Sequence, residues 1–168
     1  MPSEATFLYA VNVPGDGGDT RFANTTLAFE ALAPDRRAAL ERLRVIHSWE
    51  RSVARHGGSI TEAERTRWPP IAHPLARTHP GSGRKALFMG QHASHIEGLP
   101  LAEGQALLDE LLEHSTQDAF CYSHQWRAGD LLMWDNRCLL HRAMPNFQVD
   151  ASPRVLHRTV TQGDEVPR

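Results

Sequence analysis

The stretch from Gly129 to His141 limits the fold of this chain more than any other part of its sequence. Two short apolar runs, Leu131–Trp134 and Cys138–His141, flank the polar tripeptide Asp135–Arg137. Short apolar runs on either side of turn-forming residues are typical of paired β-strands. The sequence therefore predicts a β-sheet in this part of the chain, with the polar residues in the connecting turn.

Further strands are predicted toward both ends of the chain. Thr6–Val13 is apolar and ends at a loop rich in glycine and aspartate, and Phe120–Trp126 alternates apolar with polar residues. Arg84–Met89 and Arg154–Thr161 also have the composition of short strands. Strands at both ends with helices between them predict a mainly β fold with helical insertions (α+β), built as an antiparallel sandwich or barrel.

Three helices are predicted between these strands. The first starts at Asn24 or Thr25, the second starts at Pro34 and keeps apolar residues at helical spacing up to Ile46, and the third spans Leu101–His114. The third is amphipathic, because its leucines gather on one face.

The segment Arg55–Pro80 is polar and rich in glycine, proline and histidine. We expect it to be an excursion over a site rather than part of the core. Thr61 and Glu64 have the spacing of a capping box, which predicts one short turn of helix inside this segment.

The composition narrows the class of protein. A length of 168 residues fits a single domain over residues 1–168, and a net charge of −2 without a basic cluster argues against a nucleic-acid or membrane partner. Cys121 and Cys138 lack the spacing of a zinc ribbon or a disulfide framework. With neither a signal peptide nor an apolar run of membrane-spanning length, we expect a cytoplasmic enzyme or binding domain.

His141, Arg154 and Arg158 form the first candidate site. A histidine next to the predicted turn can bind iron, zinc or copper, and arginines four residues apart on a strand point to the same face. Two guanidinium groups on one face are costly to bury without an anion, and a ligand carboxylate would supply it. The alternatives are a hydrogen-bonded core histidine and a structural ion pair of Arg154 or Arg137 with Asp130 or Asp135.

Two further motifs allow a functional and a structural interpretation. Thr20, after Gly17-Gly18-Asp19, can hydrogen-bond a ligand carboxylate or simply cap a turn. His95 and Glu97 have the spacing of two metal ligands on one strand face, and with His141 they would complete a two-histidine, one-carboxylate triad. Gly98-Leu99-Pro100 follows directly, which is an unfavourable place for a rigid strand, so the metal interpretation is the weaker of the two.

The run Trp126–Arg137, then His141, then Arg154–Arg158, resembles the carboxy-terminal signature of the taurine and 2,4-dichlorophenoxyacetate dioxygenase family. Pro14–Asn24 is similar to the segment that follows the family's first iron ligands. The segments His73–Pro80 and Gly83–Phe88 are similar to the family's middle region, so the likeness covers nearly the whole chain.

The resemblance implies a double-stranded β-helix, or jelly roll, incomplete at its amino-terminal end, and an oxygenase dependent on Fe(II) and the cosubstrate 2-oxoglutarate. His141 would be the distal iron ligand, and Arg154 would pair with the far carboxylate of 2-oxoglutarate. Thr20 would hydrogen-bond the same cosubstrate, and Arg158 would lie beside it, near the acidic group of the substrate. The implied reaction uses O2 to hydroxylate a small organic acid, aryloxyalkanoate-like or taurine-like, and releases succinate and CO2. Family members often associate, so a homo-oligomer is expected.

In the family, a His-x-Asp pair supplies the other iron ligands shortly before the segment that resembles Gly17–Thr20; the corresponding position here falls before Met1. We therefore expect these 168 residues, on their own, to bind iron weakly and to have little or no activity. A non-catalytic remnant that serves as an interaction module is the first alternative. A cupin-like metal hydrolase that uses His95, Glu97 and His141 is the second.

Overall fold

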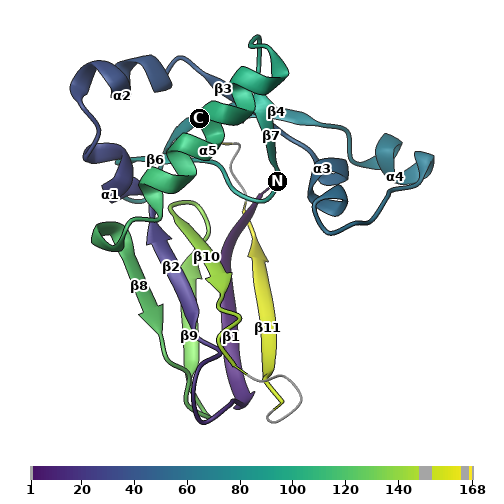
Figure 1. Cartoon of the computed structure of the whole chain (residues 1–168), viewed down its shortest axis with the longest axis vertical. Helices are drawn as coiled ribbons and strands as arrows, with labels where there is room; N and C mark the ends of the chain where they lie inside the picture. Colours follow the sequence, from purple (N-terminus) through teal and green to yellow (C-terminus); the bar gives the residue numbers. More distant parts are fainter. Residues whose placement is uncertain (1, 148–152, 164–166, 168) are drawn as a thin grey trace. The chain divides into compact units, whose positions relative to one another are not determined.

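The computed structural model describes residues 2–147, 153–163 and 167 (Figure 1). The chain divides into two compact units. Unit 1 combines Met1–Thr25 with Thr116–Val166, and unit 2 consists of Thr26–Ser115 together with Pro167–Arg168. The expectation of one domain over the whole chain stays a prediction.

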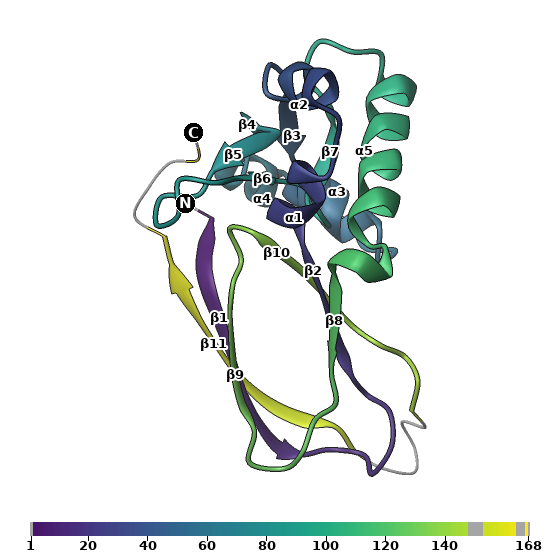
Figure 2. The same cartoon turned by 90° about the vertical axis from the view of Figure 1, so that its left-hand side faces the viewer.

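Unit 1 is built from two antiparallel sheets, each of three strands among the described residues, which face each other in Figure 2. Consecutive strands β1 and β2, and likewise β9 and β10, belong to different sheets, which is the connectivity of a jelly roll. The prediction of a mainly β jelly roll is thereby confirmed. The first sheet has the order β11 (Val155–Gln162), β1 (Ser3–Asn12), β9 (Leu131–Asp135), and the second has the order β10 (Leu139–Ala143), β2 (Thr20–Asn24), β8 (Cys121–His124).

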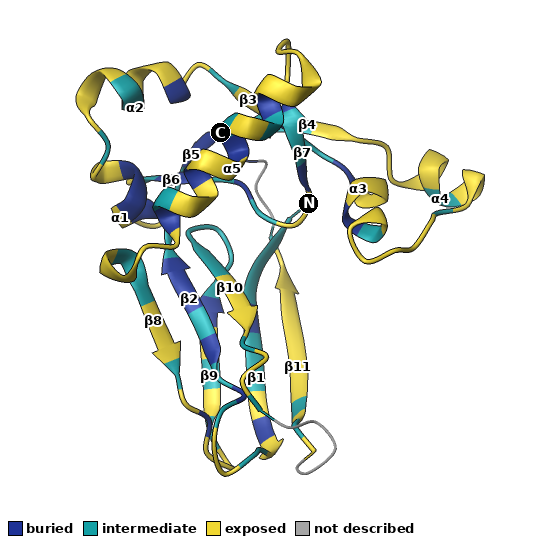
Figure 3. Cartoon of the chain, in the orientation of Figure 1, coloured by how far each residue is buried: buried dark blue, intermediate teal, exposed yellow. Residues whose placement is uncertain are grey.

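Strand register determines which side chains of unit 1 lie between the two sheets. Thr6 of β1 is opposite Trp134 of β9, and both are buried. The Trp134 ring meets Phe22 of β2 edge to face, with ring centroids 5.2 Å apart, so this contact joins the sheets. On the opposite face of β9, Leu131 and Met133 point away from the second sheet and are exposed. Figure 3 shows the same contrast between the buried strand β2 and the exposed edge strands β8 and β11.

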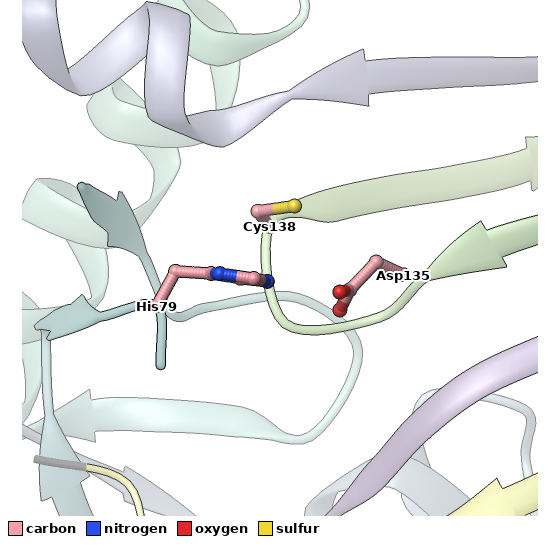
Figure 4. A group of neighbouring side chains, drawn as sticks. All are labelled: His79, Asp135 and Cys138. Atoms are coloured by element: carbon pink, nitrogen blue, oxygen red, sulfur yellow. The ribbon is translucent and has the colours of Figure 1, made fainter. Parts of the chain in front are cut away.

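The turn between β9 and β10 is held by its own polar residues (Figure 4 shows Asp135 and Cys138 on its two sides). The Arg137 backbone N–H donates to Asp135 Oδ1 at 2.8 Å, and the Arg137 guanidinium forms ion pairs with Asp135 and Glu4. Asn136 Oδ1 accepts a hydrogen bond from the indole of Trp134 at 3.0 Å. The structural ion pair that the sequence left open therefore exists for Arg137.

Unit 2 contains one three-stranded sheet, a two-stranded pair and short helices. The sheet has the order β4 (Ile71–Pro74), β3 (Arg44–His47), β7 (Ala93–Ile96), and the pair consists of β5 (Ala76–Thr78) and β6 (Lys85–Leu87). The helices are α1 (Thr25–Glu30), α2 (Pro34–Leu40), α3 (Trp49–Ala54), α4 (Glu62–Arg67) and α5 (Leu101–Ser115), and a 3-10 turn, Asp118–Phe120, leads into β8 of unit 1.

Helix α5 packs closely against β7. A Cβ at Gly104 would lie 2.7 Å from the backbone nitrogen of Ile96, so only glycine allows this approach. Leu108 and Leu111 are buried, whereas Leu112 is 41% exposed. The amphipathic helix predicted over Leu101–His114 is confirmed, with a narrower buried face than its leucines indicate.

Several other expectations can be compared with the structure. Pro34 begins α2 as predicted, and Thr61 and Glu64 form the expected capping box of α4.

Two expectations were wrong. The second helix ends at Leu40, and Ile46 lies on strand β3. The segment 55–80 also contributes the strands β4 and β5, with Leu75 and Ala76 fully or almost fully buried, because strands of three or four residues are too short to show a period in the sequence. Among the described residues, none of the helices has the length and apolar character needed to cross a membrane.

Candidate functional site

Arg154 and Thr20 lie next to each other inside unit 1. The guanidinium of Arg154 donates from Nε to the Gly18 carbonyl at 2.8 Å and from Nη2 to Thr20 Oγ1 at 3.2 Å. Both acceptors are neutral, and in the described part of the chain no carboxylate forms an ion pair with Arg154. The side chain is half-buried, and this burial lowers the pKa of Arg154 below its ordinary value while leaving it a cation. An arginine in these surroundings is suited to bind an anionic ligand.

The turn before β2 places the Gly18 carbonyl. Gly17 and Gly18 have φ angles of 71° and 70°, in the left-handed region that favours glycine. A Cβ at Gly17 would lie 2.0 Å from the Asn146 carbonyl oxygen, and the Gly18 N–H donates to Asn146 Oδ1 at 2.8 Å. Thr20 does not cap this turn, because it is the first residue of β2. The Gly-Gly pair therefore positions the backbone that holds Arg154.

The hydroxyl of Thr20 is buried, with 3% of the residue exposed. Besides Arg154, the indole N–H of Trp126 donates to Thr20 Oγ1, at 3.0 Å. Trp126 itself packs edge to face on His124, with ring centroids 4.7 Å apart. The sequence motifs predicted Thr20 and Arg154 in one site but did not indicate Trp126 as their neighbour, because Trp126 follows strand β8 and lies far from both in the sequence.

His141 lies on β10 opposite Phe22 of β2, on the same inward face as Thr20. Its ring packs against Trp134, with centroids 4.7 Å apart, although one side of His141 stays open to solvent. Partial burial, and then the positive charge of Arg158, lower the pKa of His141, so its imidazole is neutral at pH 7. A neutral imidazole with one open side can donate a nitrogen lone pair to a metal ion.

Arg158 lies on β11 opposite Leu8 of β1 and is exposed. Leu156 is opposite Ala10, so Leu156 and Arg158 share one face of β11, whereas Arg154 directly precedes the strand. The positive charge of Arg158 contributes to lowering the pKa of His141. Unit 1 thus holds all four predicted residues, with Thr20 buried, Arg154 half-buried, and Arg158 and His141 exposed.

The described residues do not complete a metal site around His141. No group of three histidine, cysteine, aspartate or glutamate side chains among them has His141 as a member with ligand atoms close enough for one ion. His95 lies on β7 of unit 2, where a strand was not expected, and its Nδ1 contacts Ser94 Oγ at 3.1 Å. Glu97 follows the strand and forms an ion pair with Arg44, so a structural role accounts for it.

A polar cavity of about 550 Å³ lies beside this site in unit 1. It is lined by the loop before β2 and by the segment that joins β8 to β9, including Asp19, Trp126 and Asp130. Thr20, Arg154, Arg158 and His141 are not among its lining residues, but Gly17 and Trp126, which border the site, are.

Residues 1–160 match the family described as the taurine catabolism dioxygenase TauD, TfdA family. The chain belongs to this family. The resemblance inferred from Trp126–Arg137, His141 and Arg154–Arg158 is confirmed.

Relatives and solved structures in this family resemble the chain over most of its length. It is 51% identical, over 162 residues, to an alpha-ketoglutarate-dependent 2,4-dichlorophenoxyacetate dioxygenase of Cupriavidus pinatubonensis; the match covers 96% of this chain and 56% of that protein. It is 39% identical, over 154 residues, to an (S)-phenoxypropionate/alpha-ketoglutarate-dioxygenase of Sphingobium herbicidovorans, with 86% of this chain and 54% of that protein covered. The crystal structure of AAD-2 in complex with Mn(II) and N-oxalylglycine matches with a TM-score of 0.91 at 36% identity, covering 99% of this chain and 66% of that one. The chain therefore spans about half the length of the curated relatives it matches.

Proposed function

We propose that this chain carries the 2-oxoglutarate-binding part, and one iron ligand, of an Fe(II)- and 2-oxoglutarate-dependent dioxygenase. The observation that carries the proposal is Arg154, a half-buried guanidinium bonded to two neutral oxygens and to no described carboxylate. A buried cation without an anion is costly, and a ligand carboxylate removes that cost. The family supplies the identity of the ligand.

The donors around Arg154 suit a carboxylate. Its Nε and one Nη2 hydrogen are used by Gly18 and Thr20, which fixes the plane of the guanidinium and leaves the Nη1 hydrogens for a ligand. The hydroxyl of Thr20, already an acceptor, can donate its own proton to the same carboxylate. Together these groups bind the far carboxylate of 2-oxoglutarate.

His141 is the proposed iron ligand of this chain. Its neutral imidazole suits Fe(II), and Trp134 holds the ring in place. When bound, Fe(II) together with 2-oxoglutarate would supply the O2-activating chemistry that hydroxylates a substrate and releases succinate and CO2. The weak iron binding and low activity expected of these 168 residues alone stay a prediction, tested by succinate formation.

The proposed substrate is a small organic acid. The relatives named above act on 2,4-dichlorophenoxyacetate and phenoxypropionate, both aryloxyalkanoates. Arg158 lies on β11, and its charge acts on His141, so its guanidinium can pair with the acidic group of such a substrate. Cytoplasmic location, a homo-oligomer and the absence of nucleic-acid partners stay predictions.

The test is ligand binding by an Arg154→Gln variant. We expect the affinity for 2-oxoglutarate, measured by calorimetry with Mn(II) present, to fall roughly 10- to 100-fold, since hydrogen bonds to charged groups contribute about 1.5–3 kcal/mol. Arg142→Gln is the matched control, because Arg142 is exposed on β10 of the same unit. Equal affinities for the wild type and both variants would overturn the proposal.

An interaction module is the second candidate function. It is favoured by the outer face of the β11-β1-β9 sheet, where Leu131 is 68% and Met133 is 61% exposed. This function predicts that neither Mn(II) nor 2-oxoglutarate raises the melting temperature of the chain. Stabilisation by both ligands together would decide for the oxygenase.

A further inference from the structure

The Thr20 hydroxyl oxygen cannot accept a further hydrogen bond. Its oxygen has two lone pairs, and two N–H groups already occupy them: the Trp126 indole at 3.0 Å and the Arg154 guanidinium at 3.2 Å. An indole N–H and a guanidinium can only donate, so neither bond can reverse its direction. The single proton of the Thr20 hydroxyl must therefore point away from both.

We propose that Trp126 is a positioning residue that fixes the Thr20 hydroxyl as a donor to the far carboxylate of the cosubstrate. This inference rests on the proposed function and goes beyond it, because Trp126 does not itself touch the ligand. If the Thr20 hydroxyl could rotate freely about its C–O bond, its proton would point away from the carboxylate part of the time. The oxygen lone pairs would then face the carboxylate and repel it. The hydrogen bond from the Trp126 indole excludes that orientation before the ligand binds.

The surroundings of Trp126 keep its N–H directed at Thr20. The residue is only 6% exposed, and its ring stands at 86° to the ring of His124. His124 is in turn held by Asp130, whose Oδ2 lies 3.0 Å from His124 Nε2 and also accepts from the Arg127 backbone N–H at 2.9 Å. Packing against His124, which Asp130 holds in place, fixes the rotamer of Trp126, as a preorganised binding site requires.

Trp126 could contribute simply by filling space, and the test separates that role from positioning. Trp126→Phe keeps an aromatic ring and removes the N–H. The two probes are 2-oxoglutarate and 2-oxopentanoate, which has the same keto-acid end and chain but lacks the far carboxylate. Affinities are measured by calorimetry or ligand-observed NMR with Mn(II) present.

We expect Trp126→Phe to weaken 2-oxoglutarate binding by roughly 3- to 10-fold, the size of one hydrogen bond. The affinity for 2-oxopentanoate should not change. A loss of affinity for both probes would mean that Trp126 only fills space, and unchanged binding of both would likewise overturn the inference. If the wild type itself does not prefer 2-oxoglutarate to 2-oxopentanoate, the proposed function fails instead, so the two failures are distinguishable.

A double-mutant cycle gives a second measurement. In a Thr20→Val background the acceptor is gone, so adding Trp126→Phe should leave the remaining 2-oxoglutarate affinity unchanged. Additive losses would contradict the inference. Should the Phe variant fail to fold, the wild-type indole N–H resonance of Trp126 serves instead: it should exchange slowly with solvent and shift on addition of 2-oxoglutarate but not of 2-oxopentanoate. An N–H that exchanges rapidly, or does not respond to either ligand, would count against positioning.

Discussion

The two units differ in the partners of their basic side chains. In unit 2, most of the ion pairs join a partly exposed arginine or lysine to a glutamate: Arg36–Glu110, Arg44–Glu97, Arg65–Glu50, Arg84–Glu30 and Lys85–Glu41. In unit 1, Arg154 is half-buried and bonded only to neutral oxygens among the described residues. Exposed pairs add little stability each, whereas a half-buried cation without an anion has a cost. The difference indicates that ligand binding is the task of unit 1.

Unit 2 also buries polar groups, but it surrounds them with aromatic rings. The Arg77 guanidinium lies 4.7 Å from the centroid of the Phe88 ring, and His47 stacks on the same ring, with centroids also 4.7 Å apart. His73 meets His47 edge to face at 5.2 Å. These groups are packed against one another within the unit, and the Phe88 ring contributes a cation–π contact to the Arg77 guanidinium.

The largest expected effect compares two arginines of unit 1. Arg137→Ala should lower the free energy of unfolding by about 3 kcal/mol, because it removes two part-buried ion pairs, with Asp135 and with Glu4. Arg154→Gln should lower it by less than about 1 kcal/mol, since no described carboxylate loses a partner. Urea unfolding monitored by circular dichroism gives both values. Equal losses would break the distinction between paired and unpaired arginines.

The next effect is a dependence on pH that belongs to unit 2. Burial, and then the nearby His73, lower the pKa of His47 from 6.5 to about 4 in the folded protein. The unfolded chain therefore binds this proton at a higher pH than the folded one, and stability falls as the pH drops below about 6.5. Between pH 7 and pH 5 the loss from His47 should be about 2 kcal/mol.

Denaturation at several pH values measures this loss, with His47→Gln as the control. The variant should lose correspondingly less stability between pH 7 and pH 5. Burial also lowers the pKa of His73 and of His92, so a smaller loss remains in the variant. A wild type whose stability is flat over this range would contradict the burial of neutral histidines in unit 2.

The smallest effect concerns the exposed part of unit 2. Thr61→Ala removes the side chain that accepts from the Glu64 backbone N–H and should destabilise helix α4 by about 1 kcal/mol. Thr66→Ala is the control, because Thr66 lies inside the helix and donates to the Glu62 carbonyl. Amide exchange in α4 is the measurement. Similar exchange in both variants would show that the cap does not stabilise this helix.

The sequence predicted unit 1 better than unit 2, for a physical reason. The strands of unit 1 alternate or form apolar runs, and the turn Asp135–Arg137 separates two of them clearly. In unit 2, β3 and β7 have only four residues each, which is too few to show a period. Ile46 also continues the helical spacing of the apolar residues before it, so the sequence predicted a helix where β3 lies. Short strands of this kind are defined by their partners in space.

The candidate site shows the same limit at the scale of single contacts. The spacing of Arg154 and Arg158 marked both as candidates at the strand that becomes β11, and His141 follows a recognisable turn. The bond between Trp126 and Thr20 joins residues 106 positions apart, and no local pattern indicates it. Residue types were therefore predictable, whereas the direction in which the Thr20 hydroxyl donates follows only from three-dimensional contacts.

Strand β1 lies between β11 and β9, with Ser3 opposite Gln162 and Thr6 opposite Trp134. During synthesis on the ribosome, β1 emerges long before either neighbour exists, while all of Thr26–Ser115 follows it. The contiguous unit 2 can condense first, and β1 must wait, with its apolar residues uncovered, until β9 and β11 have left the ribosome. Strand β1 thus completes its pairing only after more than a hundred further residues have been synthesised, and a chaperone that covers its apolar residues would protect it in that interval.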